Sequence, residues 1–211
     1  MKDGTRSYDS PRRREAAEAT RVAIADAART LFGERGWSET TVRAIAEAAQ
    51  VSEPTIYNAF GGKEGLAMAL LEDLEADADV AQARDEILTA AGHPSAQLAA
   101  LVGFDRRLFE RGGDIMVLIR EAGRTVPELA DIYTEGRHRL RGAQHVIFGA
   151  WPEGTLRPGV DLDMACDIYT GVSNVDTYRM LSEEREWPSD RIQQWWTETL
   201  GQLLLADAAR D

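Results

Sequence analysis

The sequence predicts an all-α protein, with a three-helix helix-turn-helix unit at its N-terminus and a larger helical domain behind it, about nine helices in total. Alanine, leucine, arginine and glutamate are plentiful, and these residues favour helices. No alternating run of apolar and polar residues bounded by hairpin turn residues predicts a strand. We place the domain boundary after residue 62, which gives domains 1–62 and 63–211.

The first helix is predicted over residues 11–35, because its apolar side chains recur at close to 3.6 residues. Gly36 follows it as a C-terminal cap. A short second helix starts after Thr40 or Thr41, since either hydroxyl is a suitable N-cap.

The third helix follows a tight connection at Gln50. Ser52 is its N-cap, Pro54 occupies the first turn without needing a backbone donor, and Gly61 ends it. Two helices this short need the long first helix behind them to bury their apolar faces. The three therefore form a helix-turn-helix unit, in which the third helix is free to enter a DNA major groove.

Glycines and prolines divide the rest of the chain into further helices. We expect one helix from Lys63 to a break at Gly92, then helices over 95–110 and 114–122, one opening at Pro127, one capped by Asp161 that extends to Val175, and one after Ser189.

Charge is distributed unevenly between the two domains. The whole chain carries a net charge of −12, yet residues 1–63 hold ten Lys or Arg against nine Asp or Glu. The remainder holds fourteen Arg against twenty-seven acids. A DNA site needs only a local basic face, so the acidic second domain does not exclude one in the first.

Cysteine usage and hydropathy indicate a cytoplasmic protein that does not associate with membranes. Cys166 is the single cysteine, so no disulfide forms within the chain, and we interpret it as a small buried side chain. The N-terminus leads into no apolar signal segment, and no apolar run approaches the roughly 20 residues that span a bilayer.

Residues 41–64, TVRAIAEAAQVSEPTIYNAFGGKE, closely resemble the DNA-binding signature of the TetR family of bacterial transcriptional regulators. Residues 27–36 are similar to the first helix of that family. Beyond about residue 65 the resemblance covers only the pattern of an all-helical ligand-binding and dimerisation domain. It implies a homodimer that binds a palindromic double-stranded operator and a small-molecule effector of unknown identity.

The residues themselves suit DNA contact. The hydroxyl and free N–H groups at Thr41 suit a phosphate, Arg43 can reach phosphate or a base edge, and Thr55 can meet a thymine methyl group or a phosphate. The resemblance adds Tyr57 and Lys63 as contacts to the DNA backbone. The DNA-binding residues that we expect are Thr41, Arg43, Ser52, Glu53, Pro54, Thr55, Tyr57, Asn58 and Lys63.

Two positions depart from the usual pattern of the family. Gln50 stands where a glycine often makes the turn, and a positive φ there costs a few tenths to about 1 kcal/mol. Glu53 either accepts from a cytosine amino group or faces solvent. Ahead of the first helix, Arg12–Arg14 either lie against DNA or form a solvated basic tail.

The resemblance places an effector pocket among the helices between residues 95 and 176. The expected lining is Phe104, Phe109, Met116, Arg120, Tyr133, Arg137, His138, Phe148, Trp151, Asn174 and Tyr178. Arg120 suits an acidic ligand or forms a structural ion pair with Glu121 or another neighbour. The expected dimer interface is Val172, Val175, Ile192, Trp195, Trp196, Leu200, Leu203 and Leu204, since their combined apolar face is too large to leave in water.

These observations favour a ligand-responsive dimeric repressor that is not an enzyme and needs no cofactor or metal. An all-helical enzyme using His138 or His145, or an activator that needs no effector, remains the alternative. His138, His145 and Asp131 resemble a metal cluster only loosely, because metal-binding histidine pairs more often lie four residues apart on a helix.

Overall fold

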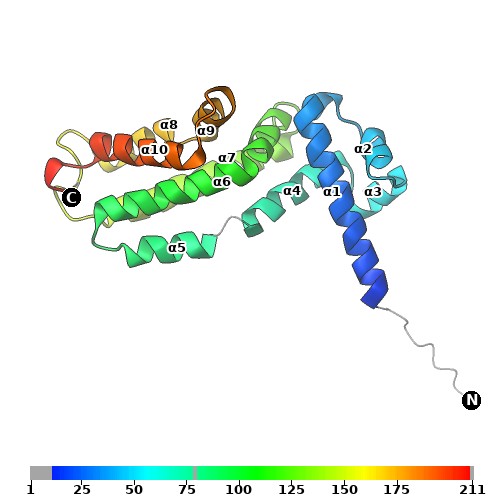
Figure 1. The fold of residues 1–211 in the computed structure, drawn as a ribbon, viewed down its shortest axis with the longest axis horizontal. Helices are drawn as coiled ribbons and strands as arrows, with labels where there is room; N and C mark the ends of the chain where they lie inside the picture. Colours follow the sequence, from blue (N-terminus) through cyan, green and yellow to red (C-terminus); the bar gives the residue numbers. More distant parts are fainter. Residues whose placement is uncertain (1–10, 78–79, 210–211) are drawn as a thin grey trace, which may run out of the picture. The chain divides into compact units, whose positions relative to one another are not determined.

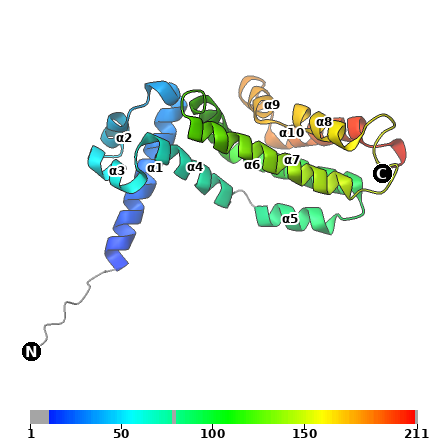
Figure 2. The same cartoon turned by 180° about the vertical axis from the view of Figure 1, so that it is seen from behind.

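The structure, a computed structural model, describes residues 11–77 and 80–209, with side chains for 13–74 and 80–209. Its backbone divides into two compact units, Met1–Leu70 and Leu71–Asp211. The division falls within a helix rather than at residue 62, because Leu66, Ala67 and Leu70 are buried along the first turns of that helix. Figures 1 and 2 show the chain from opposite sides.

The first unit contains α1 (Pro11–Glu39), α2 (Val42–Ala48), α3 (Glu53–Phe60) and the start of α4 (Lys63–Asp77). The sequence predicted that this helix ends at Gly36, but α1 continues to Glu39 and Gly36 interrupts it with a φ of 73°, a conformation that glycine adopts without strain. Each of these helices contributes buried apolar side chains: Ile24, Ala28 and Phe32 of α1, Ile45 of α2, Ile56 of α3 and Leu66 of α4.

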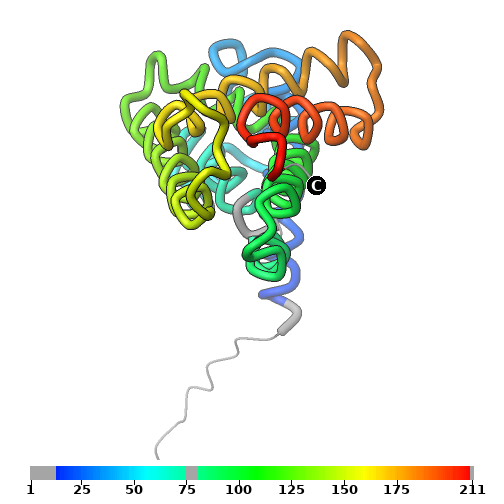
Figure 3. Tube along the Cα trace, turned by 90° about the vertical axis from the view of Figure 1, so that its left-hand side faces the viewer, coloured from blue at the N-terminus to red at the C-terminus, as the bar shows by residue number. Residues whose placement is uncertain are grey.

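The second unit is a helical bundle. It comprises the rest of α4, α5 (Val80–Thr89), α6 (Pro94–Ala122), α7 (Pro127–Gly149), α8 (Leu162–Val172), α9 (Val175–Arg179), a π-helical turn (Met180–Glu184), α10 (Ser189–Leu204) and a final 3₁₀ turn (Asp207–Ala209). The long helix α6 contacts α5, α7, α9 and α10. In Figure 3, α7 (yellow-green) and α10 (orange-red) lie on different sides of the bundle, and α8 contacts both.

Two boundaries in this unit differ from the sequence prediction. The glycines at 112–113 do not end a helix: α6 runs through them with a kink at Gly112, whose φ is −141°. The helix expected to reach Val175 ends at Val172, because Ser173 is extended and Asn174 caps α9. Of the helix expected from Lys63 to Gly92, the structure describes α4 and α5, and residues 78–79 between them lie outside the described part of the chain.

Candidate DNA interface and effector cavity

Helix α3 is held at both ends by local sequence signals. The hydroxyl oxygen of Ser52 accepts from the Thr55 N–H at 3.4 Å, and the two hydroxyl groups lie 2.8 Å apart. At the other end Gly61 adopts a φ of 79°, and its N–H donates to the carbonyl of Tyr57. Both caps were predicted from the sequence and are confirmed.

The outer face of α3 carries the side chains that we expect to contact DNA. Glu53, Pro54 and Asn58 are exposed, and 54% of the Tyr57 side chain is accessible. Thr55 is half-buried, whereas Ile56 is fully buried and fixes the inner face.

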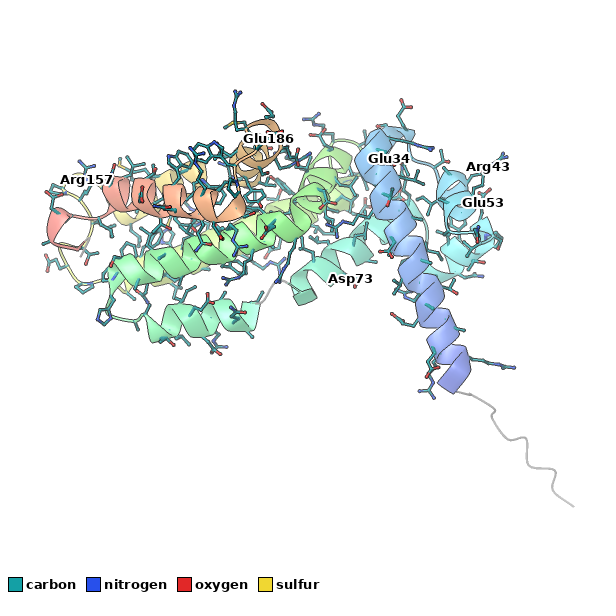
Figure 4. All side chains as sticks on the ribbon, viewed as in Figure 1. Glu34, Arg43, Glu53, Asp73, Arg157 and Glu186 are labelled. Carbon is teal, nitrogen blue, oxygen red and sulfur yellow. The ribbon has the colours of Figure 1, made fainter. Side chains whose placement is uncertain are left out.

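Helix α2 begins at Thr41, whose hydroxyl oxygen accepts from the Ala44 N–H at 3.1 Å. One turn later, the exposed Arg43 donates to the Glu47 carboxylate at 3.0 Å. Glu47, and more weakly Glu53 of α3, raise the pKa of Arg43. Arg43 and Glu53 both lie on the outer side of these helices (Figure 4).

The turn between α2 and α3 has the strained conformation that the sequence suggested. Gln50 has a φ of 56°, in the left-handed region that glycine favours. The next residue, Val51, donates its N–H to the carbonyl of Ala46 and closes the turn.

Two cations fasten the helices of the first unit together. Arg21 of α1 donates to the carbonyl of Ala59, at the end of α3, at 2.6 Å, and its guanidinium lies 4.4 Å from the Phe60 ring centroid. Lys63 donates to the carbonyls of Trp37 at 2.8 Å and Thr40 at 3.0 Å. Burial lowers the pKa of Lys63.

This engagement of Lys63 was not anticipated from the sequence, which indicated only a phosphate contact. Two of the three N–H donors of its ammonium are directed at carbonyl groups of the protein. Arg13 and Arg14 of the basic segment are exposed, whereas the side chain of Arg12 lies outside the described part of the chain.

A cavity of about 750 Å³ lies in the second unit, between α6, α7, α8 and the start of α9. Seven of the expected pocket residues line it: Phe109, Met116, Arg120, Tyr133, Arg137, His138 and Asn174. Its other lining residues are Asp105, Leu140, Arg141, Gln144, Asp167, Thr170, Gly171, Ser173, Val175 and Asp176.

Four expected pocket residues are not part of this lining. Phe148 and Trp151 pack on each other, with ring centroids 4.7 Å apart, and the indole of Trp151 donates to Gln97. Tyr178 is buried, with its hydroxyl 3.0 Å from that of Ser189, and Phe104 is half-buried on α6. We expected all four side chains to line the pocket, Tyr178 as a polar group and the other three as apolar walls, but Phe148, Trp151 and Tyr178 are buried in the core instead.

Two arginines of the cavity are neutralised by carboxylates. Arg120 makes a bidentate pair with Asp176, at 2.6 and 3.0 Å, whereas its contact with Glu121 is longer, at 3.9 Å. Arg141 pairs with Asp167 and with Asp163, the second at 3.0 Å. The sequence left open whether Arg120 binds an acidic ligand or forms an ion pair within the protein. In the structure it forms the ion pair, with Asp176.

A buried acid in the cavity was missed at the sequence level. Oδ2 of Asp105 accepts from the hydroxyl groups of Tyr169 and Ser173, each at 2.8 Å. Burial raises the pKa of Asp105 to about 6, although both hydroxyl groups act in the opposite direction. The signal was present in the sequence, because Asp105 lies four residues from Leu101 and from Phe109 and so falls on the apolar stripe of α6.

The expected dimer residues divide into two groups. Val175, Ile192, Trp196, Leu200 and Leu204 are buried within this chain, so their side chains are not available to a second subunit. Trp195 and Leu203 are each 37% exposed, and Val172 is half-buried. Trp195 packs edge-on against Trp187, and the guanidinium of Arg191 lies 3.9 Å from the ring centroid of Trp187.

The two histidines considered as metal ligands have different surroundings. His145 pairs with Asp163 at 3.0 Å, whereas His138 lines the cavity. Within residues 11–77 and 80–209, no three His, Cys, Asp or Glu side chains gather as a set of metal ligands. In the same part of the chain, no helix has the length and apolar character needed to cross a bilayer.

Residues 24–70 match the family described as bacterial regulatory proteins, tetR family. The chain is 27% identical to the HTH-type transcriptional repressor KstR2 of Rhodococcus jostii over 151 residues, which cover 69% of this chain and 72% of the relative. It is 34% identical to the HTH-type transcriptional regulator AlkX of Mycobacterium tuberculosis over 122 residues, 56% of each protein. A transcriptional regulator of Saccharomonospora viridis, solved in complex with choline, shares the fold: the TM-score is 0.67 and the identity 18%, over 90% of this chain and 99% of that one.

Proposed function

Because this chain belongs to the tetR family of bacterial regulatory proteins, we propose that it is a homodimeric transcriptional repressor released from DNA by a small molecule. The observation that carries the proposal is helix α3, which is capped at both ends and presents Glu53, Pro54, Tyr57 and Asn58 outward. Each subunit inserts this helix into one major-groove half-site of a palindromic operator. The KstR2 relative is a transcriptional repressor, which supports repression rather than activation.

The remaining expected DNA contacts surround α3. Thr41 and Ser52 present N-terminal helix turns to phosphates, Thr55 and Tyr57 add hydroxyl groups, and Arg43 reaches a phosphate or a base edge once it leaves Glu47. Lys63 contributes the N–H that its two carbonyl partners do not take. We assign its main role to holding α1 and α4 in position beside α3.

The cavity between α6, α7 and α8 is the proposed effector site. Its volume, about 750 Å³, is that of a site for a drug-sized molecule. The choline complex of a protein with the same fold supports a small-molecule ligand here. Helix α4 provides a continuous connection, since it begins at Lys63 in the first unit and extends into the second.

Release follows when the effector binds one state of the dimer more tightly than the DNA-bound state. The effector shifts the equilibrium only by this difference in affinity, so a ligand that binds both states equally leaves the operator occupied. The proposed subunit contact includes the exposed Trp195 and Leu203 of α10 and the half-buried Val172 of α8.

The test is a titration of the purified chain against the DNA upstream of its own gene at several salt concentrations. We expect two subunits per palindromic site and a steep fall in affinity with salt. A lack of preference over random DNA would call for selection from random oligonucleotides, and failure there too would overturn the regulator in favour of the enzyme alternative. A reporter transcribed from the bound promoter separates repression from activation.

A further inference from the structure

Asp105 is a buried carboxylate without a cation. Its side chain is 6% exposed, and both of its described hydrogen bonds, from Tyr169 and Ser173, come from neutral hydroxyl groups to Oδ2. No described lysine, arginine or histidine forms an ion pair with it. Buried charges in proteins are normally paired, because an unpaired one loses its hydration without compensation.

The other acids of the cavity lining do have cations. Asp176 holds Arg120, and Asp167 holds Arg141. Among the described residues that line the cavity, Asp105 is therefore the carboxylate that no protein cation neutralises. The remaining basic groups, Arg137 and His138, are exposed side chains of α7.

One oxygen of Asp105 remains available. No described group donates to Oδ1, and Oδ1 is not one of the fully buried polar atoms that lack a partner. A buried side chain that lines the cavity thus keeps an accessible acceptor there. Apolar side chains of Phe109, Met116 and Val175 line the same cavity.

A purely structural role does not require a charge at this position. An amide oxygen would accept from the Tyr169 and Ser173 hydroxyl groups with the same geometry and without the desolvation of a carboxylate. Although burial raises the pKa of Asp105 to about 6, the carboxylate stays mostly ionised at neutral pH. The negative charge is consistent with a partner that comes from outside the protein.

We propose that the cavity binds a ligand with a protonated amine, which donates to Oδ1 of Asp105, on an apolar body that packs against Phe109 and Met116. The assignment of an amine rests on the proposed function, and it adds the chemical class of the effector. The amine supplies the missing cation, and Tyr169 and Ser173 keep the carboxylate oriented. Ser173 also ends α8, so the ligand binds beside the break between α8 and α9.

The experiment compares three probes that share one hydrocarbon frame and differ in charge: phenylpropylamine, phenylpropanol and phenylpropanoate. Their affinities for the full-length chain are measured by isothermal titration calorimetry at neutral pH, where the amine is protonated. We expect the amine to bind at least about tenfold more tightly than the alcohol or the carboxylate. Equal affinities of the three probes for the unmodified chain, or tighter binding of the carboxylate probe, would overturn the proposal.

Two charge-removing variants then locate the site. Asp105→Asn is expected to lower the amine affinity to that of the alcohol, and to leave the affinity for the alcohol unchanged. Asp131→Asn is the matched control, because it makes the same change at an exposed acid of α7 outside the cavity lining and should leave the preference for the amine intact. Loss of the preference in both variants, or in neither, would contradict a specific contact with Asp105.

The operator titration keeps this inference separate from the proposed function. If the chain prefers the amine through Asp105 but binds no operator, the ligand site stands and the proposed function as a DNA-binding regulator fails. If the chain binds its operator but shows no preference for the amine, the proposed function stands and the assignment of an amine ligand fails.

Discussion

The ammonium nitrogen of Lys63 lies 2.8 Å from the carbonyl oxygen of Trp37 and 4.2 Å from the centroid of the same residue's indole ring. This contact joins the first residue of α4 to the C-terminal end of α1, 26 positions earlier in the chain. Arg21 makes the corresponding connection from α1 to the end of α3. The orientation of the recognition helix therefore depends on two cations that contact backbone carbonyls and aromatic rings.

Replacing Lys63 with methionine tests this connection, because Lys63→Met retains the aliphatic stem and removes the charge. We expect the free energy of unfolding to fall by about 1–3 kcal/mol, since two charged hydrogen bonds and a cation–π contact are lost. Chemical denaturation followed by circular dichroism measures the change. Arg43→Met is the control: its exposed ion pair with Glu47 should leave stability unchanged.

The same variant separates a structural role of Lys63 from a phosphate contact. If the third N–H of the ammonium reaches a phosphate, the slope of log affinity against log salt should decrease in magnitude by about 0.9. Relative affinities for different operator sequences should not change. An unchanged slope with weaker binding would assign Lys63 to the support of the protein fold alone.

Gln50→Gly should stabilise the first unit by a few tenths to about 1 kcal/mol, because glycine adopts a φ of 56° without strain. The gain is limited by the greater freedom of glycine in the unfolded chain. Gln50→Ala is the matched variant, and it should give no gain because alanine keeps the Cβ that causes the strain. Equal stabilities of the glycine and alanine variants would show that the turn carries no strain.

Gly65 is a site where a side chain does not fit. A Cβ there would lie 1.7 Å from the carbonyl oxygen of Phe60, the last residue of α3. We expect Gly65→Ala to cost at least about 2 kcal/mol and to weaken operator binding, because the backbone at the end of α3 must move. Gly33→Ala in α1 meets no atom within 4 Å, and it should leave stability unchanged or raise it by up to about 1 kcal/mol.

The local features of the fold were predictable from the sequence. The caps Thr41, Ser52 and Asp161 need only a hydroxyl or carboxylate beside the first turn of a helix, and the structure contains all three. Features that depend on distant neighbours were not predictable. The break at Ser173 is held by Asp105, which lies 68 positions earlier in the chain.

Helix α10 shows that sequence also does not determine what covers an apolar helix face. Its apolar face was evident from the spacing of Ile192, Trp196 and Leu200, but the sequence did not determine what would cover it. The rest of the same chain covers this face completely, and the large apolar side chains of α10 that remain exposed are Trp195 and Leu203. A hydrophobic period identifies a buried face, yet it does not distinguish burial within one subunit from burial between two.

Trp195 and Leu203 lie eight positions apart, about two helical turns, and so share one side of α10. If they form the proposed subunit contact, we expect Trp195→Glu and Leu203→Glu to convert the proposed dimer to a monomer and to abolish binding to a two-half-site operator, because a carboxylate in an apolar contact loses its hydration. Light scattering coupled to size-exclusion chromatography measures the mass. Val146→Glu, at a side chain of α7 that is 74% exposed, should remain dimeric, and monomers from all three variants would argue against a specific role for α10.

The pKa of Asp105 has a consequence for stability. The pKa is about 6 in the folded chain, against 3.8 for the unfolded reference, because burial disfavours the charged form. Between these values the folded chain holds a proton that the unfolded chain has released. The free energy of unfolding therefore falls as pH rises through this window, and the difference in pKa corresponds to about 3 kcal/mol.

Asp105→Asn removes this dependence, so we expect the variant to be more stable than the native chain at pH values above the folded pKa of about 6. The gain in the free energy of unfolding should approach about 3 kcal/mol. It should shrink as pH falls toward the unfolded pKa, because the folded native chain then holds Asp105 in its protonated form and no longer buries a charge. Denaturant unfolding of both proteins across this range measures the difference, which isolates residue 105 because the two proteins are otherwise identical. A stability difference that does not change with pH would contradict the raised pKa. A gain near neutral pH, together with lost amine binding, would show that the carboxylate reduces stability and is needed for recognition of the ligand.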